Sequence, residues 1–148
     1  MYFVDFPLEI ITSIQEVDLD TLKCHEEVVG NRLSSFIDYL KTLDGDILMS
    51  SIIVCDETMI IIDGHHRYHA LKHFGLKKIP VTFIKYSSPQ IKAYYDDRIS
   101  KSEIIDIVNS GKLLSPKSSK HVIYDKKLNT YLPILLLSSM WHFNLKLN

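Results

Sequence analysis

Five consecutive residues, Asp63 to Arg67, form the polar stretch DGHHR. An apolar run precedes them and a segment of helical spacing follows, so we expect a strand that leads directly into a helix. The first backbone N–H groups of such a helix have no partner within it and attract an anion. Gly64 allows a ligand to approach the backbone, and donors follow on His65, His66 and Arg67. The stretch therefore predicts a phosphate site, with Asp63 beside it to hold a metal ion or to orient the histidines.

Simpler interpretations of the same residues exist. An Asp-Gly pair before a helix is typical of a turn, and a histidine near a helix start is typical of a surface position. Zinc is another alternative, because His65, His66 and His69 offer nitrogen ligands. Adjacent histidines on a helix diverge by about 100°, however, and rarely reach one metal ion. The five residues in combination favour the phosphate site.

A second polar cluster, SPKSSKH, runs from Ser115 to His121. Its proline interrupts regular structure. The residues after the proline carry ammonium, hydroxyl and imidazole groups, and they are Lys117, Ser118, Ser119, Lys120 and His121. Such a segment is often only a solvated loop, but hydroxyl and cationic donors on a loop also bind phosphate. Together with the first cluster, it would hold further phosphates of a nucleotide.

Two carboxylates, Glu26 and Glu27, precede a predicted helix over 30–43. Carboxylates are favoured electrostatically near a helix N-terminus, which is the simpler interpretation. A carboxylate that points into a phosphate site could instead act as the general base that removes a proton from an attacking hydroxyl.

Apolar spacing predicts the elements that position these groups. Helices are expected over 30–43, over 65–74 with Gly75 after its end, and in the stretch SKSEIIDIVNSG. The last stretch has the spacing of a capping box at Ser100 and Glu103.

Strands are expected between these helices. The stretch SIIVCDETMIIID predicts a hairpin, and KIPVTFIKY predicts another strand with Pro80 at its start. The mixture of helices with a hairpin indicates the α+β class, as a compact mixed sheet with flanking helices. A chain of 148 residues predicts a single domain, 1–148.

Composition narrows the classes of function. The net charge is -1, from 17 basic and 18 acidic residues, so we expect no nucleic-acid partner. Cys24 and Cys55 lack metal-binding spacing and fit reduced thiols in a cytoplasmic protein, although one disulfide is compatible with them. The start MYFVDFPLEI lacks the basic region of a signal peptide.

One strongly apolar segment, YLPILLLSSMWHF, lies near the end of the sequence. It is too short to span a bilayer, so we expect no membrane partner. It predicts a core strand or a short helix, or a subunit interface if the core does not use it. The oligomeric state stays open.

Three separated motifs carry a resemblance to a known family. IIDGHHRYHALKHFGLKKIPV resembles the signature turn and helix of the ParB/sulfiredoxin-like superfamily, and its DGHHR form is similar to that of the free L-serine kinases. VDLDTLKCHEEVVGNRLSSFIDYL resembles their N-terminal HE segment and helix. ISKSEIIDIVNSGKLLSPKSSKHVI resembles their helix and SPK(S/T)(S/T)(R/K)H loop. The motifs stand in the same order between Val17 and Ile123.

This resemblance implies a kinase that transfers a phosphoryl group from ATP or ADP to free L-serine, giving O-phospho-L-serine. Glu26 matches the catalytic glutamate, which acts as the general base, and Asp63 is the second choice for the base. The resemblance also implies Mg²⁺, bound mainly by phosphate oxygens and water, with Asp63 as the candidate protein ligand.

The resemblance assigns the remaining polar residues to phosphate. Asp63, Gly64, His65, His66 and Arg67 match the phosphate-handling turn, whose histidines and arginine would stabilise the transferred group. Ser118, Ser119, Lys120 and His121 match the nucleotide-phosphate loop.

The chain also departs from these kinases. Only SSPQIKAYYDD stands where the longer proteins carry an insertion that forms one lobe of the cleft, which leaves the residues that fix serine specificity open. Lys120 replaces an arginine, so the positive charge is kept but the bidentate hydrogen bonding of a guanidinium is lost.

Two relatives within the superfamily give rival functions. Sulfiredoxins need a reactive cysteine at the position of His65, so a redox function is excluded. A ParB-like nucleotide-binding and DNA-binding switch without small-molecule kinase activity is the alternative. It would require a basic surface and a downstream helix-turn-helix domain, whereas the residues after His121 are largely apolar.

Overall fold

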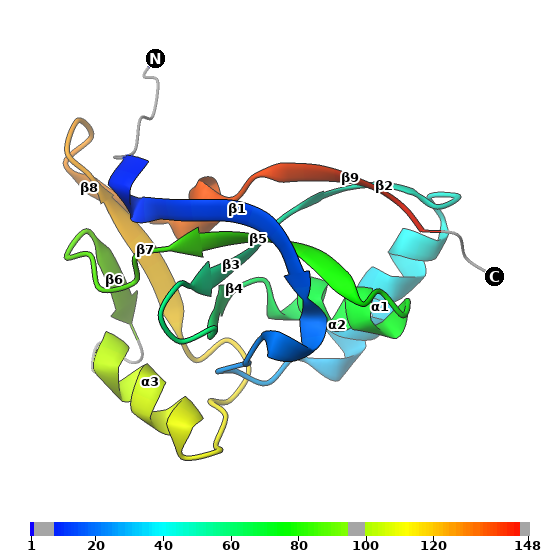
Figure 1. Cartoon of the computed structure of the whole chain (residues 1–148), viewed down its shortest axis with the longest axis horizontal. Helices are drawn as coiled ribbons and strands as arrows, with labels where there is room; N and C mark the ends of the chain where they lie inside the picture. The colour runs from blue at the N-terminus through cyan, green and yellow to red at the C-terminus, as the bar shows by residue number, and fades with distance from the viewer. Residues whose placement is uncertain (2–7, 95–99, 146–148) are drawn as a thin grey trace.

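The computed structural model describes residues 1, 8–94 and 100–145. Its largest sheet is mixed and has the strand order β1-β5-β3-β4 (Figure 1). The four strands are β1 (Ile11–Asp18), β5 (Lys78–Ile84), β3 (Ile52–Cys55) and β4 (Ile61–Asp63). Strand β5 runs antiparallel to β1 and parallel to β3, and β3 and β4 form the expected hairpin.

Two smaller antiparallel sheets complete the strands of the described residues. One pairs β2 (Asp46–Ser50) with β9 (Met140–Asn144), and the other joins β6 (Ile91–Tyr94), β7 (Lys120–Asp125) and β8 (Thr130–Pro133). The predicted α+β class is confirmed, but the strands divide into three sheets where one mixed sheet was expected. Part of the segment that replaces the kinase insertion, 95–97, lies outside the described residues.

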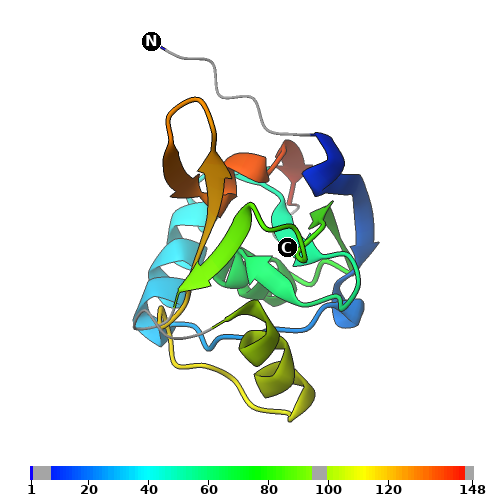
Figure 2. The same ribbon diagram turned by 90° about the vertical axis from the view of Figure 1, so that its left-hand side faces the viewer.

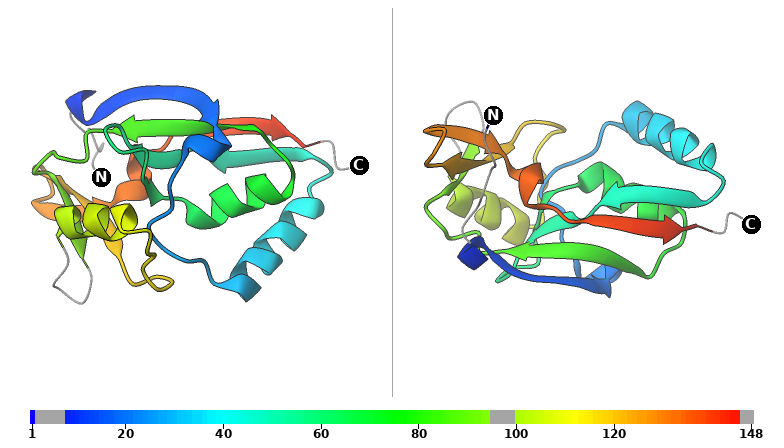
Figure 3. Two further views of the ribbon diagram at one scale, coloured as in Figure 1. Left: turned by 60° about the horizontal axis from the view of Figure 1, so that its bottom comes forward. Right: turned by 90° about the horizontal axis from the view of Figure 1, so that it is seen from above.

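The helices flank the sheets at two places. Helices α1 (Gly30–Lys41) and α2 (His65–His73) pack together at one end, and α3 (Lys101–Asn109) lies at the other end beside β6 and β7 (Figures 2 and 3). Three short 3-10 helices are η1 (Leu8–Ile10), η2 (Leu19–Thr21) and η3 (Ile134–Leu137).

The predicted helices are confirmed with small changes at their ends. Helix α1 stops at Lys41, before the predicted Leu43. The Ser100 hydroxyl accepts a hydrogen bond from the Glu103 N–H at 3.4 Å, so the predicted cap begins α3.

Strand β3 connects two hydrophobic cores. Ile52 and Val54 pack in the core that includes α1 and α2, whereas Ile53 and Cys55 pack in the core that includes β7 and η3. Successive side chains of a strand point to opposite faces, so burial on both faces requires the continuous apolar run seen in the sequence. The cores fix the sheet edge at β4, and β4 ends at the polar turn.

Pro80 is the third residue of β5 and lies slightly inside the strand. The pairing of β5 with β3 begins one residue later, at Val81 opposite Ile52. The missing N–H of Pro80 therefore removes no hydrogen bond on that side, which explains why the strand tolerates it.

The apolar segment 131–143 contains the end of β8, the short helix η3 and most of β9. Ile134 and Leu137 are buried, while Leu135 and Leu136 are 42% and 52% exposed. The prediction of a core strand or short helix is confirmed. Among the described residues, no helix combines the length and apolar character needed to cross a membrane.

Candidate functional site

The chain segment around Glu26 runs between the edge of β4 and the loop that precedes β7. On one side, the Ile61 N–H donates to the Lys23 carbonyl at 2.7 Å. On the other side, the Leu114 N–H donates to the His25 carbonyl at 2.8 Å. These backbone bonds bring Glu26 next to both polar clusters, although the three motifs are far apart in the sequence.

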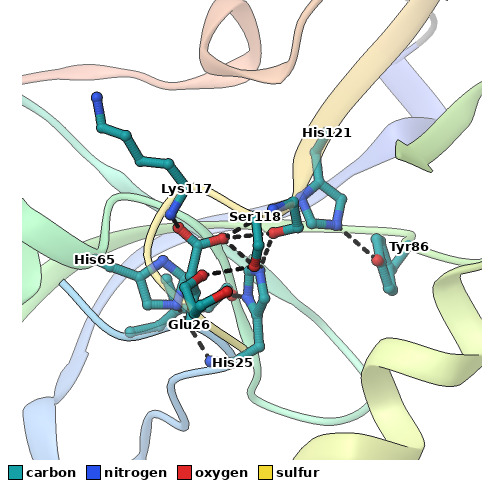
Figure 4. Close-up of polar contacts among 10 residues, drawn as sticks. His25, Glu26, His65, Tyr86, Lys117, Ser118 and His121 are labelled. Carbon is teal, nitrogen blue, oxygen red and sulfur yellow. Dashed lines mark hydrogen bonds and ion pairs between the residues drawn. The ribbon is translucent and has the colours of Figure 1, made fainter. Parts of the chain in front are cut away.

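The Glu26 carboxylate is anchored by the SPKSSKH loop. Its Oε1 accepts the Lys117 N–H at 2.5 Å, and its Oε2 accepts the Ser119 N–H at 3.2 Å and lies 2.7 Å from the Ser119 hydroxyl (Figure 4). Lys117 has a φ of +56°, in the left-handed region, which costs of order 1 kcal/mol outside glycine. The backbone N–H that reaches the carboxylate thus belongs to a residue in a strained conformation.

His25 lies directly behind this carboxylate and is buried. Its Nδ1–H donates to the Ile61 carbonyl at 2.6 Å, and its Nε2 lies 2.8 Å from the Ser119 hydroxyl. Burial lowers the pKa of His25, whereas the Ile61 carbonyl and the negative charge of Glu26 act to raise it.

His65 and His121 are also buried beside His25. The His65 Nε2 accepts the His25 N–H at 3.2 Å, and the His121 Nε2 shares a hydrogen bond of 2.7 Å with the Tyr86 hydroxyl. Burial is the main cause that lowers the pKa of His65 well below its usual value and the pKa of His121 to about 3. Both side chains are therefore neutral and engaged with protein groups, whereas the sequence suggested donors that face phosphate.

The turn before α2 has the expected strand-to-helix geometry. Gly64 has a φ of +107°, and a Cβ at this position would lie 2.8 Å from the Arg67 Nη2. The same Nη2 donates to the Asp63 Oδ2 at 3.2 Å and to the Ser51 carbonyl at 3.2 Å. Asp63 therefore orients Arg67, and not the histidines as the sequence suggested.

Two nitrogen atoms at this turn are buried without a partner among the described residues. They are the His66 Nε2 and the Arg67 Nε. Burial and the nearby charge of Arg32 lower the pKa of His66. Buried polar groups are nearly always hydrogen-bonded, so these two nitrogens are exceptions at a turn whose helix N-terminus favours anions.

Two pockets adjoin at these residues. One has a volume of about 330 Å³ and the other about 340 Å³. Four residues line both of them: Glu26, Asp63, His65 and Ser119. The second pocket, called the cationic pocket below, is completed by Gly64, His66, Arg67 and Lys117. The first, called the mixed pocket, is completed by His25, Lys120, His121 and an apolar wall of Ile62, Pro133, Ile134 and Leu135.

The structure brings the sequence-predicted residues together, with one at the periphery. The Ser118 hydroxyl donates to the Ser115 carbonyl at 2.5 Å, and Ser118 is not among the described residues that line these two pockets. Lys120 is exposed and reaches the mixed pocket.

Sequence reasoning missed three parts of the site. It noted His25 only as the neighbour of Glu26, and it gave no role to Tyr86. It also assigned the segment around Leu135 to the core or an interface, although this segment forms the apolar wall of the mixed pocket. No local signal distinguishes such a wall from ordinary core sequence.

The side chains suit some metal ions better than others. Among the described residues, no three His, Cys, Asp or Glu side chains are placed to hold a metal ion together. His69, one of the residues of the zinc alternative, lies 3.9 Å from the Cys24 thiol. Mg²⁺ in nucleotide sites needs only one or two carboxylates besides phosphate oxygens and water. Asp63 lines both pockets and fits that requirement.

The chain is similar to several known proteins. No family model matches the chain. A ParB-like protein of Sulfolobus acidocaldarius is 41% identical over 78 residues, covering 53% of this chain and 38% of that protein. An ATP-dependent L-serine kinase of Staphylothermus marinus is 28% identical over 128 residues, covering 81% and 50%. An ADP-dependent L-serine kinase of Thermococcus kodakarensis is 27% identical over 96 residues, covering 62% and 39%. The chain thus spans half or less of the length of these relatives.

A solved structure of a free serine kinase in complex with AMP has a similar fold. The two superpose with a TM-score of 0.67 at 16% sequence identity, over 82% of this chain and 91% of that one. The similarity supports the fold, and the α+β arrangement of the described residues is that of this kinase.

Proposed function

We propose that this chain transfers a phosphoryl group from ATP or ADP to the hydroxyl of free L-serine and releases O-phospho-L-serine. One observation carries the proposal: the Glu26 carboxylate lies on the wall shared by a cationic pocket and a second pocket. A base between a phosphate site and an acceptor site is the arrangement that phosphoryl transfer to a hydroxyl requires. The names of the two kinase relatives support serine as the acceptor and an adenine nucleotide as the donor.

The cationic pocket would hold the phosphates. The N-terminal N–H groups of α2 offer donors, the side chains of His66 and Arg67 line the pocket, and the ion pair with Asp63 fixes the direction of the guanidinium. Lys117 adds a cation from the opposite loop. These groups would stabilise the charge on the transferred phosphoryl group.

The mixed pocket would hold the acceptor against Glu26. Glu26 would take the proton of the serine hydroxyl as the oxygen attacks phosphorus, and Asp63 is the second choice for this base. Mg²⁺, held through phosphate oxygens and water with Asp63 as the protein ligand, would neutralise phosphate charge.

We also propose that residues 1–148 act as one catalytic domain. The two pockets draw on residues from both ends of the described chain, from His25 to Leu135. Neither core would therefore carry a complete site alone.

Phosphorus NMR on the purified protein tests the function directly. The protein is incubated with Mg²⁺ and L-serine, once with ATP and once with ADP, and D-serine serves as the control acceptor. A new phosphomonoester signal that requires L-serine is expected, and the productive nucleotide identifies the donor. If neither nucleotide gives this signal, the proposed function is wrong.

A nucleotide-dependent DNA switch is the second candidate, and the name of the ParB-like relative favours it. The net charge of -1 argues against a DNA partner, because affinity for DNA depends on a basic surface. Fluorescence anisotropy with labelled duplex DNA, with and without nucleotide, separates the two functions. Nucleotide-dependent DNA binding without phosphoserine formation would favour the switch.

A further inference from the structure

Four polar groups form a continuous chain of short contacts from the interior to the shared wall of the pockets. The Ile61 carbonyl lies 2.6 Å from the His25 Nδ1, and the His25 Nε2 lies 2.8 Å from the Ser119 hydroxyl. The same hydroxyl lies 2.7 Å from the Glu26 Oε2. Each of these distances is that of a hydrogen bond, and each hydrogen bond needs its own proton.

The usual protonation states supply one proton too few. A carbonyl only accepts, so the His25 Nδ1 must carry a proton. A neutral His25 then has a bare Nε2, which requires the single proton of Ser119. The contact between the Ser119 and Glu26 oxygens would be left with no proton if Glu26 were ionised. The geometry therefore requires one additional proton, either on Glu26 or on the His25 Nε2.

We propose that His25 holds this additional proton through Ser119, and so keeps the Glu26 carboxylate free to act as the base of the proposed kinase reaction. With the proton on the His25 Nε2, His25 donates to Ser119 and Ser119 donates to Glu26. With the proton on Glu26, both hydrogen bonds reverse and the base is blocked. Ser119 thus allows the proton to shift between the two residues while every contact remains a hydrogen bond. His25 and Ser119 are positioning residues for Glu26.

The surroundings of Glu26 favour the active arrangement. Its carboxylate accepts the N–H groups of Lys117 and Ser119 in addition to the Ser119 hydroxyl, and hydrogen bonds of this kind stabilise the charged form. The Oε1 atom keeps one lone pair for the acceptor hydroxyl. In the reaction, the hydroxyl proton passes to this lone pair while the new O–P bond forms. The P–O bond to the leaving nucleotide breaks and its electron pair stays with the nucleotide. The proton on His25 does not leave.

The groups that face His25 are neutral or negatively charged, which favours His25 as the residue that holds the additional proton. His65 on α2 and His121 on β7 have ring centres 4.5 and 5.3 Å away, and burial keeps both neutral. Glu26 and, at longer range, Asp63 at the end of β4 supply negative charge that favours a cationic His25. Burial is the largest influence and leaves the pKa of His25 below its usual value. The additional proton is therefore held on His25 only through the hydrogen-bonded chain to Glu26.

Nitrogen NMR of the histidine rings tests the proposal without using activity. Long-range ¹⁵N–¹H spectra of the labelled protein are recorded between pH 5 and pH 9. We expect both ring nitrogens of His25 to be protonated near neutral pH in the unaltered protein. In Glu26→Gln and in Ser119→Ala, the pH at which His25 loses its Nε2 proton should fall by at least about one unit.

Two serine variants give the controls. Ser118→Ala removes the adjacent hydroxyl, which bonds to Ser115, and should leave the His25 signals unchanged. Ser119→Thr restores a hydroxyl and should return the titration toward that of the unaltered protein. A neutral His25 near pH 7 in the unaltered protein would overturn the proposal, and so would an unchanged His25 titration in Ser119→Ala.

Kinetics then separate this proposal from the proposed function. With L-serine and nucleotide, Ser119→Ala should lower kcat by about tenfold or more, because the hydroxyl contacts the base Glu26. A rise in KM for the nucleotide would report the separate phosphate contact expected of Ser119. If no phosphoserine forms with any variant, the kinase function fails while the NMR result still decides whether the three residues share the proton. If phosphoserine forms and kcat of Ser119→Ala is unchanged, the role of the shared proton in catalysis is wrong.

Discussion

His65 and His66 follow each other in the sequence but belong to different parts of the site. The His65 ring is buried, and its Nε2 is occupied by the His25 N–H. The His66 ring lines the cationic pocket, and its Nε2 is without a partner in the described part of the chain. A helix turns by about 100° per residue, so two adjacent identical side chains meet two different environments. One histidine is part of the buried framework, and the other lines the pocket proposed to hold phosphate.

The same contrast, buried against open to the pocket, holds for the residues around His65 and His66, which form two walls of the site. The buried wall contains His25, His65 and His121, and two of these rings are held neutral by burial, because a charge without water is costly. The open wall contains His66, Arg67 and Lys117, and the last two bring positive charge to the cationic pocket. The site thus separates residues that maintain geometry from residues proposed to bind phosphate, and Glu26 lies between the two groups.

Glu26→Gln tests the residue between the walls and should have the largest effect. Glutamine keeps the shape and one acceptor oxygen but cannot take a proton, so kcat for phosphoserine formation should fall by about 10²–10⁴-fold. The Kd of the nucleotide, measured by titration calorimetry, should change little, since phosphate contacts come from the open wall. Glu27→Gln is the matched control, because Glu27 is exposed. A Glu26→Gln enzyme with near-normal turnover would remove Glu26 from the role of base.

Gly64→Ala tests the open wall. The new Cβ would lie 2.8 Å from the Arg67 Nη2 and 3.0 Å from the Ile52 Cδ1, at a φ of +107° that L residues rarely adopt. We expect a loss of about 1 kcal/mol or more in the free energy of unfolding and a nucleotide Kd weaker by about tenfold, as Arg67 is displaced. Denaturant unfolding and calorimetry measure the two effects.

Gly75→Ala separates strain from displacement of Arg67. Gly75 also has a positive φ, +79°, but a Cβ there would meet no described heavy atom within 4 Å. This control should lose stability through backbone strain and keep its nucleotide affinity. An equal loss of affinity in both variants would show that Arg67 is not the cause.

Local patterns predicted most of the framework. The spacing of apolar residues located the helices and the hairpin, because core packing imposes those periods on the sequence. The strand-to-helix turn at Gly64 was predictable for a different reason, because few residues other than glycine fit its backbone conformation. The split of the strands into three sheets was not, because pairing joins distant segments such as β2 and β9.

The individual roles of the site residues depend on contacts that no short pattern contains. The sequence placed Ser119 among phosphate ligands, whereas its hydroxyl contacts Glu26 and His25 in the structure. Its role as a phosphate ligand stays a prediction. The burial of His65 depends on His25, which approaches from another segment of the chain. Residue types therefore indicated the chemistry of the site. Only the three-dimensional contacts separate the residues of the buried wall from those of the open wall.

The buried wall should make the folded protein less stable in acid, while the effect at neutral pH should be small. Burial lowers the pKa of His121 to about 3, from about 6.5 in the unfolded chain. Between pH 3 and pH 6.5, His121 binds a proton in the unfolded chain but stays neutral in the folded protein. The contribution of neutral His121 to stability is therefore complete above pH 6.5 and is lost as the pH falls toward 3. His121→Gln keeps a neutral partner for Tyr86 and removes this titration. Its free energy of unfolding, measured in urea, should fall less steeply with acidification, by up to about 1.4 kcal/mol per pH unit. His73→Gln, on the exposed side of α2, should follow the unaltered protein. Parallel pH curves for all three proteins would mean that His121 is not held neutral by the fold.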